Sequence, residues 1–195
     1  MQEEIQIRAE PQLEPHQCKF VVLDKPIDHG AFAFKDAQEA RGSAIAEEIF
    51  AQGNEVASVM VNENTVFVTL KEAKDWREVG KSFGEAIRRA FASGKDLISP
   101  QFKKRKPLEQ ELIGKVNTVI HNQINPAVAS HGGMIELMEV RNNDVFLKMS
   151  GGCQGCGMAA VTLKQGVEEA LKREFPEIRD IYDITDHSAG QNPYY

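Results

Sequence analysis

Two prolines enclose a run of four basic residues in the middle of this 195-residue chain, and that segment limits what the chain can fold into. The segment is Ser99-Pro100-Gln101-Phe102-Lys103-Lys104-Arg105-Lys106-Pro107. Prolines and a block of like charge interrupt both helical and strand periodicity. We therefore expect a basic linker at residues 99–108. It separates one domain at residues 1–98 from another at 109–187, and a flexible tail follows at 188–195.

The charge distribution excludes one large class of partner. The chain has a formal net charge of −6, and residues 1–98 and 109–187 are each net acidic. Acidic domains repel a phosphate backbone, which argues against nucleic-acid binding. No apolar run reaches the roughly 20 residues that span a bilayer. The acidic start Met1-Gln2-Glu3-Glu4 resembles neither a secretory signal nor a transit peptide, so we expect a cytoplasmic protein without membrane contact.

Residue periodicity predicts the elements of the first domain. Alternating and β-branched apolar residues indicate strands at residues 5–7, 20–23, 56–61 and 65–70. The last two are joined by a hairpin turn at 62–64. Helical spacing predicts helices over 40–50 and 76–91, and Asp75 is typical of the N-cap of the second.

The second domain shows a similar mixture of patterns. A long amphipathic helix is expected over residues 112–128, with Pro126 kinking it or beginning its last turn. Strands follow at 134–140 and 145–149 about a turn at Asn142-Asn143, then a helix over 160–171 and a strand over 178–184. The fold class is therefore α+β: two small domains, each a short β-sheet with helices packed on one face.

One motif carries chemistry, the pair Cys153 and Cys156 in Gly151-Gly152-Cys153-Gln154-Gly155-Cys156-Gly157. Thiolates at i and i+3 reach one metal ion or one cluster edge, and in a reducing compartment such a pair indicates a metal or redox role. Glycines allow a tight backbone turn. The loop is predicted to run from a strand into a helix N-terminus, where the helix dipole lowers the pKa of a thiol.

Iron–sulfur clusters and structural zinc sites both require four protein ligands, and the motif supplies two. Cys18 lies in the other domain and is expected to be a small buried hydrophobe. Two copies of the loop supply four thiolates, so we expect a homodimer bridged by the cluster on its two-fold axis. We expect His131 to serve a turn or cap, with a hydrogen bond toward the cysteine site as the alternative. Methionines at 134, 138, 149 and 158 are expected to fill the core, with shielding of the cluster from water as the alternative.

The second domain resembles the cluster-binding domain of the Nfu family, the C-terminal module of NifU-type scaffold proteins. The matching residues are Ile124-Asn125-Pro126, His131-Gly132-Gly133 and Gly151 to Cys156. Residues 1–98 resemble the Nfu N-terminal domain through Pro15, Lys19-Phe20 and Phe91-Ala92-Ser93-Gly94. This chain has Glu14 where the family usually has Asn, and His131 where many members carry Asp.

The resemblance implies an iron–sulfur cluster carrier with Cys153 and Cys156 as its metal ligands. It would bind a 4Fe–4S cluster, with 2Fe–2S as the smaller alternative. It would receive clusters from upstream cluster-assembly proteins and deliver them to apo-proteins. The N-terminal domain would recognise targets or partners.

Three other interpretations of the motif remain. A zinc-binding interaction module would require two further Cys or His at similar spacing, and none follows. A thiol–disulfide oxidoreductase has its C-x-x-C near the start of a βαβ unit, whereas this one follows a hairpin late in the chain. A KH-type G-x-x-G loop should be basic, and this one is neutral. The sequence shows no nucleophile paired with a base and no phosphate loop, so we expect no enzyme.

Overall fold

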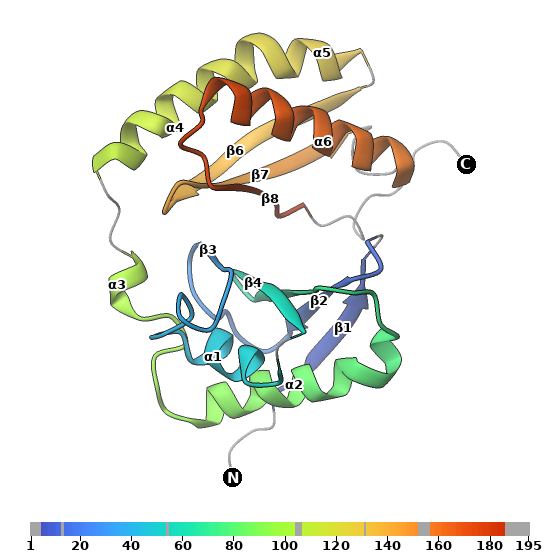
Figure 1. Ribbon diagram of the computed structural model, residues 1–195, viewed down its shortest axis with the longest axis vertical. Coiled ribbons are helices and arrows are strands. Elements are labelled where there is room, and N and C mark those ends of the chain that lie inside the picture. Colours follow the sequence, from blue (N-terminus) through green and yellow to red (C-terminus); the bar gives the residue numbers. More distant parts are fainter. Residues whose placement is uncertain are drawn as a thin grey trace. The chain divides into compact units, whose positions relative to one another are not determined.

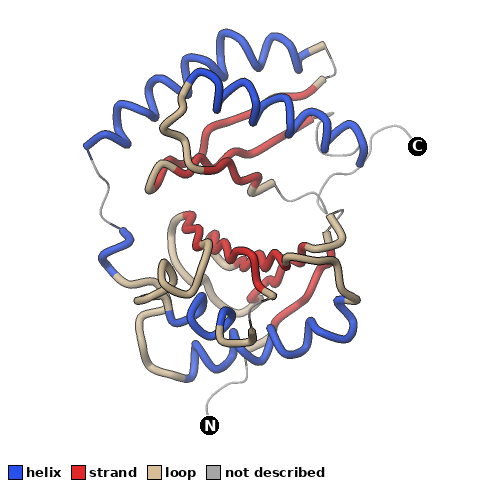
Figure 2. Tube along the Cα trace, viewed as in Figure 1, coloured by secondary structure: helices blue, strands red, loops and turns tan. Residues whose placement is uncertain are grey.

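The computed structural model describes residues 5–12, 14–53, 55–103, 107–130, 132–151 and 157–185. The chain divides into two compact units, residues 1–104 and residues 105–195, and each contains a sheet with helices (Figure 1). In each unit the helices lie on one side of the sheet (Figure 2). The predicted α+β class is confirmed. The predicted bounds of the two domains stay predictions.

Unit 1 is built on a five-stranded antiparallel sheet with strand order β1-β2-β5-β4-β3. Its strands are β1 (Ile7–Pro11), β2 (Gln17–Val22), β3 (Ala31–Phe34), β4 (Val56–Asn62) and β5 (Thr65–Leu70). Two helices, α1 (Ala44–Phe50) and α2 (Trp76–Ala92), contribute buried side chains to the same core as the sheet. Apolar residues at alternate strand positions and at helical spacing therefore form one core, as the periodicity predicted.

A helix cap and a hairpin turn in unit 1 lie where the sequence predicted them. The Asp75 carboxylate accepts a hydrogen bond from the Arg77 N–H at 2.9 Å and caps α2. The hairpin between β4 and β5 turns at Glu63, whose φ of 52° suits a two-residue loop. Strand β3 was not predicted. Four residues are too short a run for periodicity to identify, and its pairing with β4 defines it.

The predicted linker contains a helix, which corrects the expectation of no regular element there. Helix α3 (Pro100–Lys103) packs onto unit 1. The Phe102 ring meets Phe34 edge-on with centroids 5.2 Å apart, and Lys103 Nζ lies 2.6 Å from the Asp28 carboxylate. These contacts are far apart in sequence, so local patterning did not indicate them. Residues 104–106 lie outside the described residues.

Unit 2 contains a three-stranded sheet of order β6-β7-β8. Its elements are α4 (Pro107–Val119), the π-helical turn η1 (Ile120–Ile124), α5 (Asn125–Ala129), β6 (Gly133–Arg141), β7 (Asp144–Gly151), α6 (Gly157–Glu174) and β8 (Asp180–Asp183). Strands β6 and β7 are antiparallel, and β7 and β8 are parallel. Asn142 and Asn143, both at positive φ, form the predicted hairpin turn.

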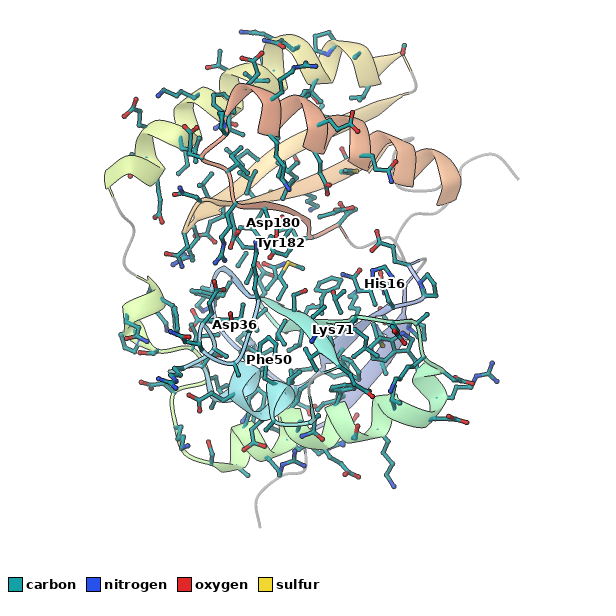
Figure 3. The ribbon with its side chains drawn as sticks, viewed as in Figure 1. His16, Asp36, Phe50, Lys71, Asp180 and Tyr182 are labelled. Carbon is teal, nitrogen blue, oxygen red and sulfur yellow. The ribbon has the colours of Figure 1, made fainter. Side chains whose placement is uncertain are left out.

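The two faces of this sheet have different neighbours. Val145, Leu147 and Met149 of β7 belong to the core shared with the helices. Because strand side chains alternate, Phe146 lies on the opposite face, where its ring stacks on Tyr182 at 5.3 Å. Figure 3 shows Tyr182 on the side of the sheet away from α4 and α6. Among the described residues, no helix has both the length and the apolarity for a bilayer crossing.

Candidate functional site

The two predicted cluster ligands lie between a strand end and a helix start. Strand β7 ends at Gly151 and helix α6 begins at Gly157, so the predicted strand-to-helix setting of the loop is confirmed. Residues 152–156, which include Cys153 and Cys156, lie outside the described residues. The roles of both cysteines therefore stay predictions. What the structure describes is the frame that holds the two ends of their loop.

The entrance to the loop is a close contact between two backbone segments. Gly151 has φ of +67°, and a Cβ built on it would lie only 2.1 Å from the Gly132 carbonyl oxygen. Gly151 also pairs in register with Gly133. Only glycine suits both the positive φ and the close approach. The glycines on both strands thus fix where the chain leaves β7 to enter the cysteine loop.

Asn125 holds the neighbouring strand in place. Its side-chain oxygen accepts a hydrogen bond from the Ile135 N–H at 2.8 Å, and its side-chain amide donates to the Ile135 carbonyl at 3.0 Å. Strand β6 is an edge of the sheet, so without these bonds the polar groups of Ile135 would lack a strand partner. The Asn125 side-chain amide therefore forms the two hydrogen bonds that a neighbouring strand would otherwise make with Ile135.

A change of helical pitch positions Asn125. The turn η1 is π-helical, and the Asn125 N–H donates to the Ile120 carbonyl five residues earlier. Pro126 lies in the first turn of α5, where its missing N–H is tolerated, and this confirms the prediction that it begins the last turn of the long helix. A π turn inserts a residue and rotates the later residues about the helix axis. Asn125 is the first residue after that rotation.

Thr185 restrains the other side of β7. Its hydroxyl oxygen accepts from the Met149 N–H at 2.7 Å, two residues before Gly151, and its hydroxyl donates to the Asp183 carboxylate. Thr185 is 2% exposed, so this contact is made in the interior of the unit. The last residues of β7 are thus held by the sheet, by glycine contacts and by Thr185. The sequence analysis did not identify Thr185, since a single threonine after a strand carries no local signal.

Cys18 is placed as the sequence predicted. It is fully buried in the core of unit 1, and its thiol donates to the Lys19 carbonyl at 3.7 Å. Burial raises the pKa of this thiol from 9.0 to about 12, and the nearby Glu10 charge acts in the same direction. Cys18 therefore stays protonated at neutral pH and does not supply a thiolate.

The methionine prediction was partly wrong. Met149 is buried in the core, but Met134 and Met138 are 51% and 50% exposed. Met134 alternates with buried Ile135 and so faces away from the helices, whereas Met138 lies at a β-bulge between Leu137 and Glu139. The side chain of Met158 and all of His131 lie outside the described residues. Within those residues, no three His, Cys, Asp or Glu side chains gather into a metal site.

Comparison with known proteins covers both units. The family model of the NifU-like domain matches residues 116–182, and that of the scaffold protein Nfu/NifU N terminal matches residues 5–94. The chain is 47% identical over 100 residues to an Fe/S biogenesis protein NfuA from Ruthia magnifica subsp. Calyptogena magnifica, which is 50% of this chain and 52% of that protein. It is 43% identical over 101 residues to the protein of the same name from Salmonella arizonae, covering 51% and 53%.

The chain spans about half the length of the curated relatives it matches. Among solved structures, a NifU-like protein from Saccharomyces cerevisiae aligns over 51% of this chain and 88% of its own, with 21% identity and a TM-score of 0.45.

Proposed function

Since the chain belongs to the Nfu/NifU-type family, we propose that it carries an iron–sulfur cluster and passes that cluster to apo-proteins. Cys153 and Cys156 would be the ligands. Two copies of the chain would hold one 4Fe–4S cluster between them, because four thiolates are required and each chain brings two. Upstream cluster-assembly proteins would supply the cluster. We place this work in the cytoplasm.

The observation that supports the proposal best is the frame around the cysteine loop. The loop starts at a glycine contact that fixes the end of β7, and it leads into the N-terminus of an 18-residue helix. Free N–H groups and the positive end of the helix dipole stabilise thiolates there. No acidic residue occurs between Ser150 and Thr162 to oppose a dianionic cluster. The frame thus holds the described ends of the loop, and the sequence around the cysteines has no carboxylate to oppose an anion.

The cluster would be cargo, and its release would be an exchange of ligands. An acceptor thiol loses its proton, and the resulting thiolate bonds to an iron atom. The Cys153 or Cys156 thiolate leaves that iron and takes up a proton. No electron is transferred, and the number of bonds to iron is unchanged. Such an exchange needs no general base or nucleophile from the protein, which fits a carrier that is not an enzyme.

Anaerobic reconstitution with iron and sulfide tests the proposal. A coloured dimer with about four iron and four sulfide per two chains is expected, as four thiolates per cluster require. Replacing Cys153 or Cys156 with alanine should abolish cluster binding. Cys18→Ala is the matched control and should retain it, with folding of unit 1 checked by the fluorescence of Trp76, the single tryptophan.

Two results would contradict the carrier. A colourless monomer that forms a reversible disulfide between Cys153 and Cys156 would favour the thiol–disulfide oxidoreductase. A protein that retains zinc and excludes iron under the same anaerobic conditions would favour the zinc-binding interaction module.

A further inference from the structure

Strand β1 presents backbone hydrogen-bonding groups at the outer edge of the unit 1 sheet. It is the first strand in the order β1-β2-β5-β4-β3, so within the part of the chain that the structure describes no strand lies on its outer side. The Val22 N–H of β2 donates to Asn64 at 2.8 Å, away from β1. Ile7 lies opposite Val22 in an antiparallel pair, so its N–H and C=O point to the outer edge, as do those of Ala9. These groups are spaced to receive another extended strand.

One side chain of unit 1 already forms a hydrogen bond to the outer edge of this strand, as a partner strand would. The Nε of Arg88 on α2 donates to the Ile5 carbonyl at 3.1 Å, two residues before Ile7 along the same outer edge. Pro11, at the far end of β1, has no N–H to offer. The available stretch is therefore short and centred on Ile7 and Ala9.

A groove runs along this edge. Helix α2 contacts β1 and lies beside it in Figure 1, and a cavity of about 320 Å³ is lined by residues of β1, β2 and α2. Phe20 and Trp76 form its apolar part, and both are largely buried. The space above Gly80 of α2 is open, since a Cβ built there would meet no atom within 4 Å. The groove thus has room for side chains that a strand at the β1 edge would direct inward.

The rim of the groove is positive. Arg77, Lys81 and Arg88 fall on one side of α2 at i, i+4 and i+11, and all three line the cavity. The side chains of Arg77 and Lys81 are 92% and 85% exposed. Among the described residues their carboxylate partners are Asp75 and Glu85, at 3.7 and 4.0 Å, beyond normal hydrogen-bond distance. These cations make the rim of the groove positive although the sequence is acidic overall.

We propose that the outer edge of β1 and this groove bind an extended acidic segment of a partner protein by strand addition. The partner backbone pairs with Ile7 and Ala9, and its alternate side chains enter the groove over Gly80. The carboxylates are among these groove-facing side chains and meet Arg77, Lys81 and Arg88, which selects an acidic segment over a basic one. This binding goes beyond cluster carriage and requires no cluster.

The test uses the full chain without cluster and a fluorescein-labelled ten-residue peptide of alternating Glu and Val, followed by fluorescence anisotropy. The Glu–Val peptide should bind, and an alternating Lys–Val peptide should not. Lys81→Glu should weaken binding by at least about tenfold, because it places like charges together. Lys95→Glu makes the same charge change at an exposed position that does not line the groove, and it should leave binding unchanged.

Two further variants separate strand addition from simple charge attraction. Ala9→Pro removes the outward N–H at an edge position where proline is tolerated, and Gly80→Leu fills the groove. Both should abolish binding while the circular dichroism spectrum stays native. Binding that survives Ala9→Pro, equal binding of the Lys–Val peptide, or equal losses from Lys81→Glu and Lys95→Glu would each overturn the proposal. So would self-association of the chain through β1 in place of peptide binding. Because no cluster is involved, failure here leaves the carrier proposal untouched.

Discussion

Replacing Asn125 with alanine tests whether a single amide secures the strand beside the cysteine loop. The change removes both hydrogen bonds to Ile135, at 2.8 and 3.0 Å. Ile135 is 1% exposed, so water does not readily replace them. A buried backbone group left unsatisfied costs ~1–3 kcal/mol, so the two together should lower the free energy of unfolding of unit 2 by about 2–6 kcal/mol. For a unit of this size the midpoint of thermal unfolding should fall by roughly 10 °C or more.

The assay can separate the two units within one molecule. Trp76, the single tryptophan, lies in unit 1, so its fluorescence reports the unfolding of that unit alone. Hydrogen exchange measured by mass spectrometry on peptides covering β6 reports unit 2, and the amide of Ile135 should lose protection in Asn125→Ala. Asn122→Ala is the matched control, because Asn122 is exposed on η1 three residues earlier. It should change stability by no more than about 0.5 kcal/mol.

Two outcomes would refute this reasoning. One is that the β6 amides of the Asn125→Ala variant keep the same protection from hydrogen exchange as those of the natural chain. The other is an equal shift of the Trp76 transition, which would mean that the loss is not confined to unit 2.

The backbone at Gly151 and the thiol of Cys18 support two further predictions. Gly151→Ala should destabilise unit 2 by about 1–3 kcal/mol in urea unfolding, because a Cβ would lie 2.1 Å from the Gly132 carbonyl at a φ of +67°. Gly166→Ala, in an exposed part of α6 with nothing within 4 Å, should instead stabilise it by about 0.5–1 kcal/mol, and the opposite ranking would contradict the close contact. The pKa of Cys18 is raised by burial from 9.0 to about 12, so the folded state keeps a proton that the unfolded state releases. Stability should therefore fall as pH rises from about 9 toward 12, by up to about 1.4 kcal/mol per pH unit, and Cys18→Ala should remove that slope in alkaline urea titrations.

The elements that the sequence predicted correctly are those specified by neighbours in the chain. The Asp75 cap, the turn at Glu63 and the Asn142-Asn143 hairpin each depend on a residue and its immediate backbone. Helix and strand periodicity likewise located the apolar faces that became the two cores. Such signals are complete within a few residues, so a single sequence contains them.

The features that the sequence missed depend on contacts between distant residues. Helix α3 is four residues long and is held by Phe34, which lies in a strand that was itself missed. The exposure of Met134 depends on which face of β6 meets the helices. For the candidate site, the motif predicted the strand-to-helix setting that the structure has, whereas the role of its cysteines stays a prediction. It did not indicate that Asn125 and Thr185 hold the strands on either side.

The parallel pairing of β7 with β8 has a consequence for synthesis on the ribosome. Because Thr185 follows β8, the contact that restrains Met149 forms only after α6 and β8 have been made. Domains generally fold as units, N-terminal first, during translation. Unit 1 can therefore be complete while the cysteine loop of the nascent chain is still without its full frame. A ribosome that stalls after the codon for Cys156 and before that for Thr185 has made both cysteines before the full structure that holds the ends of their loop can form.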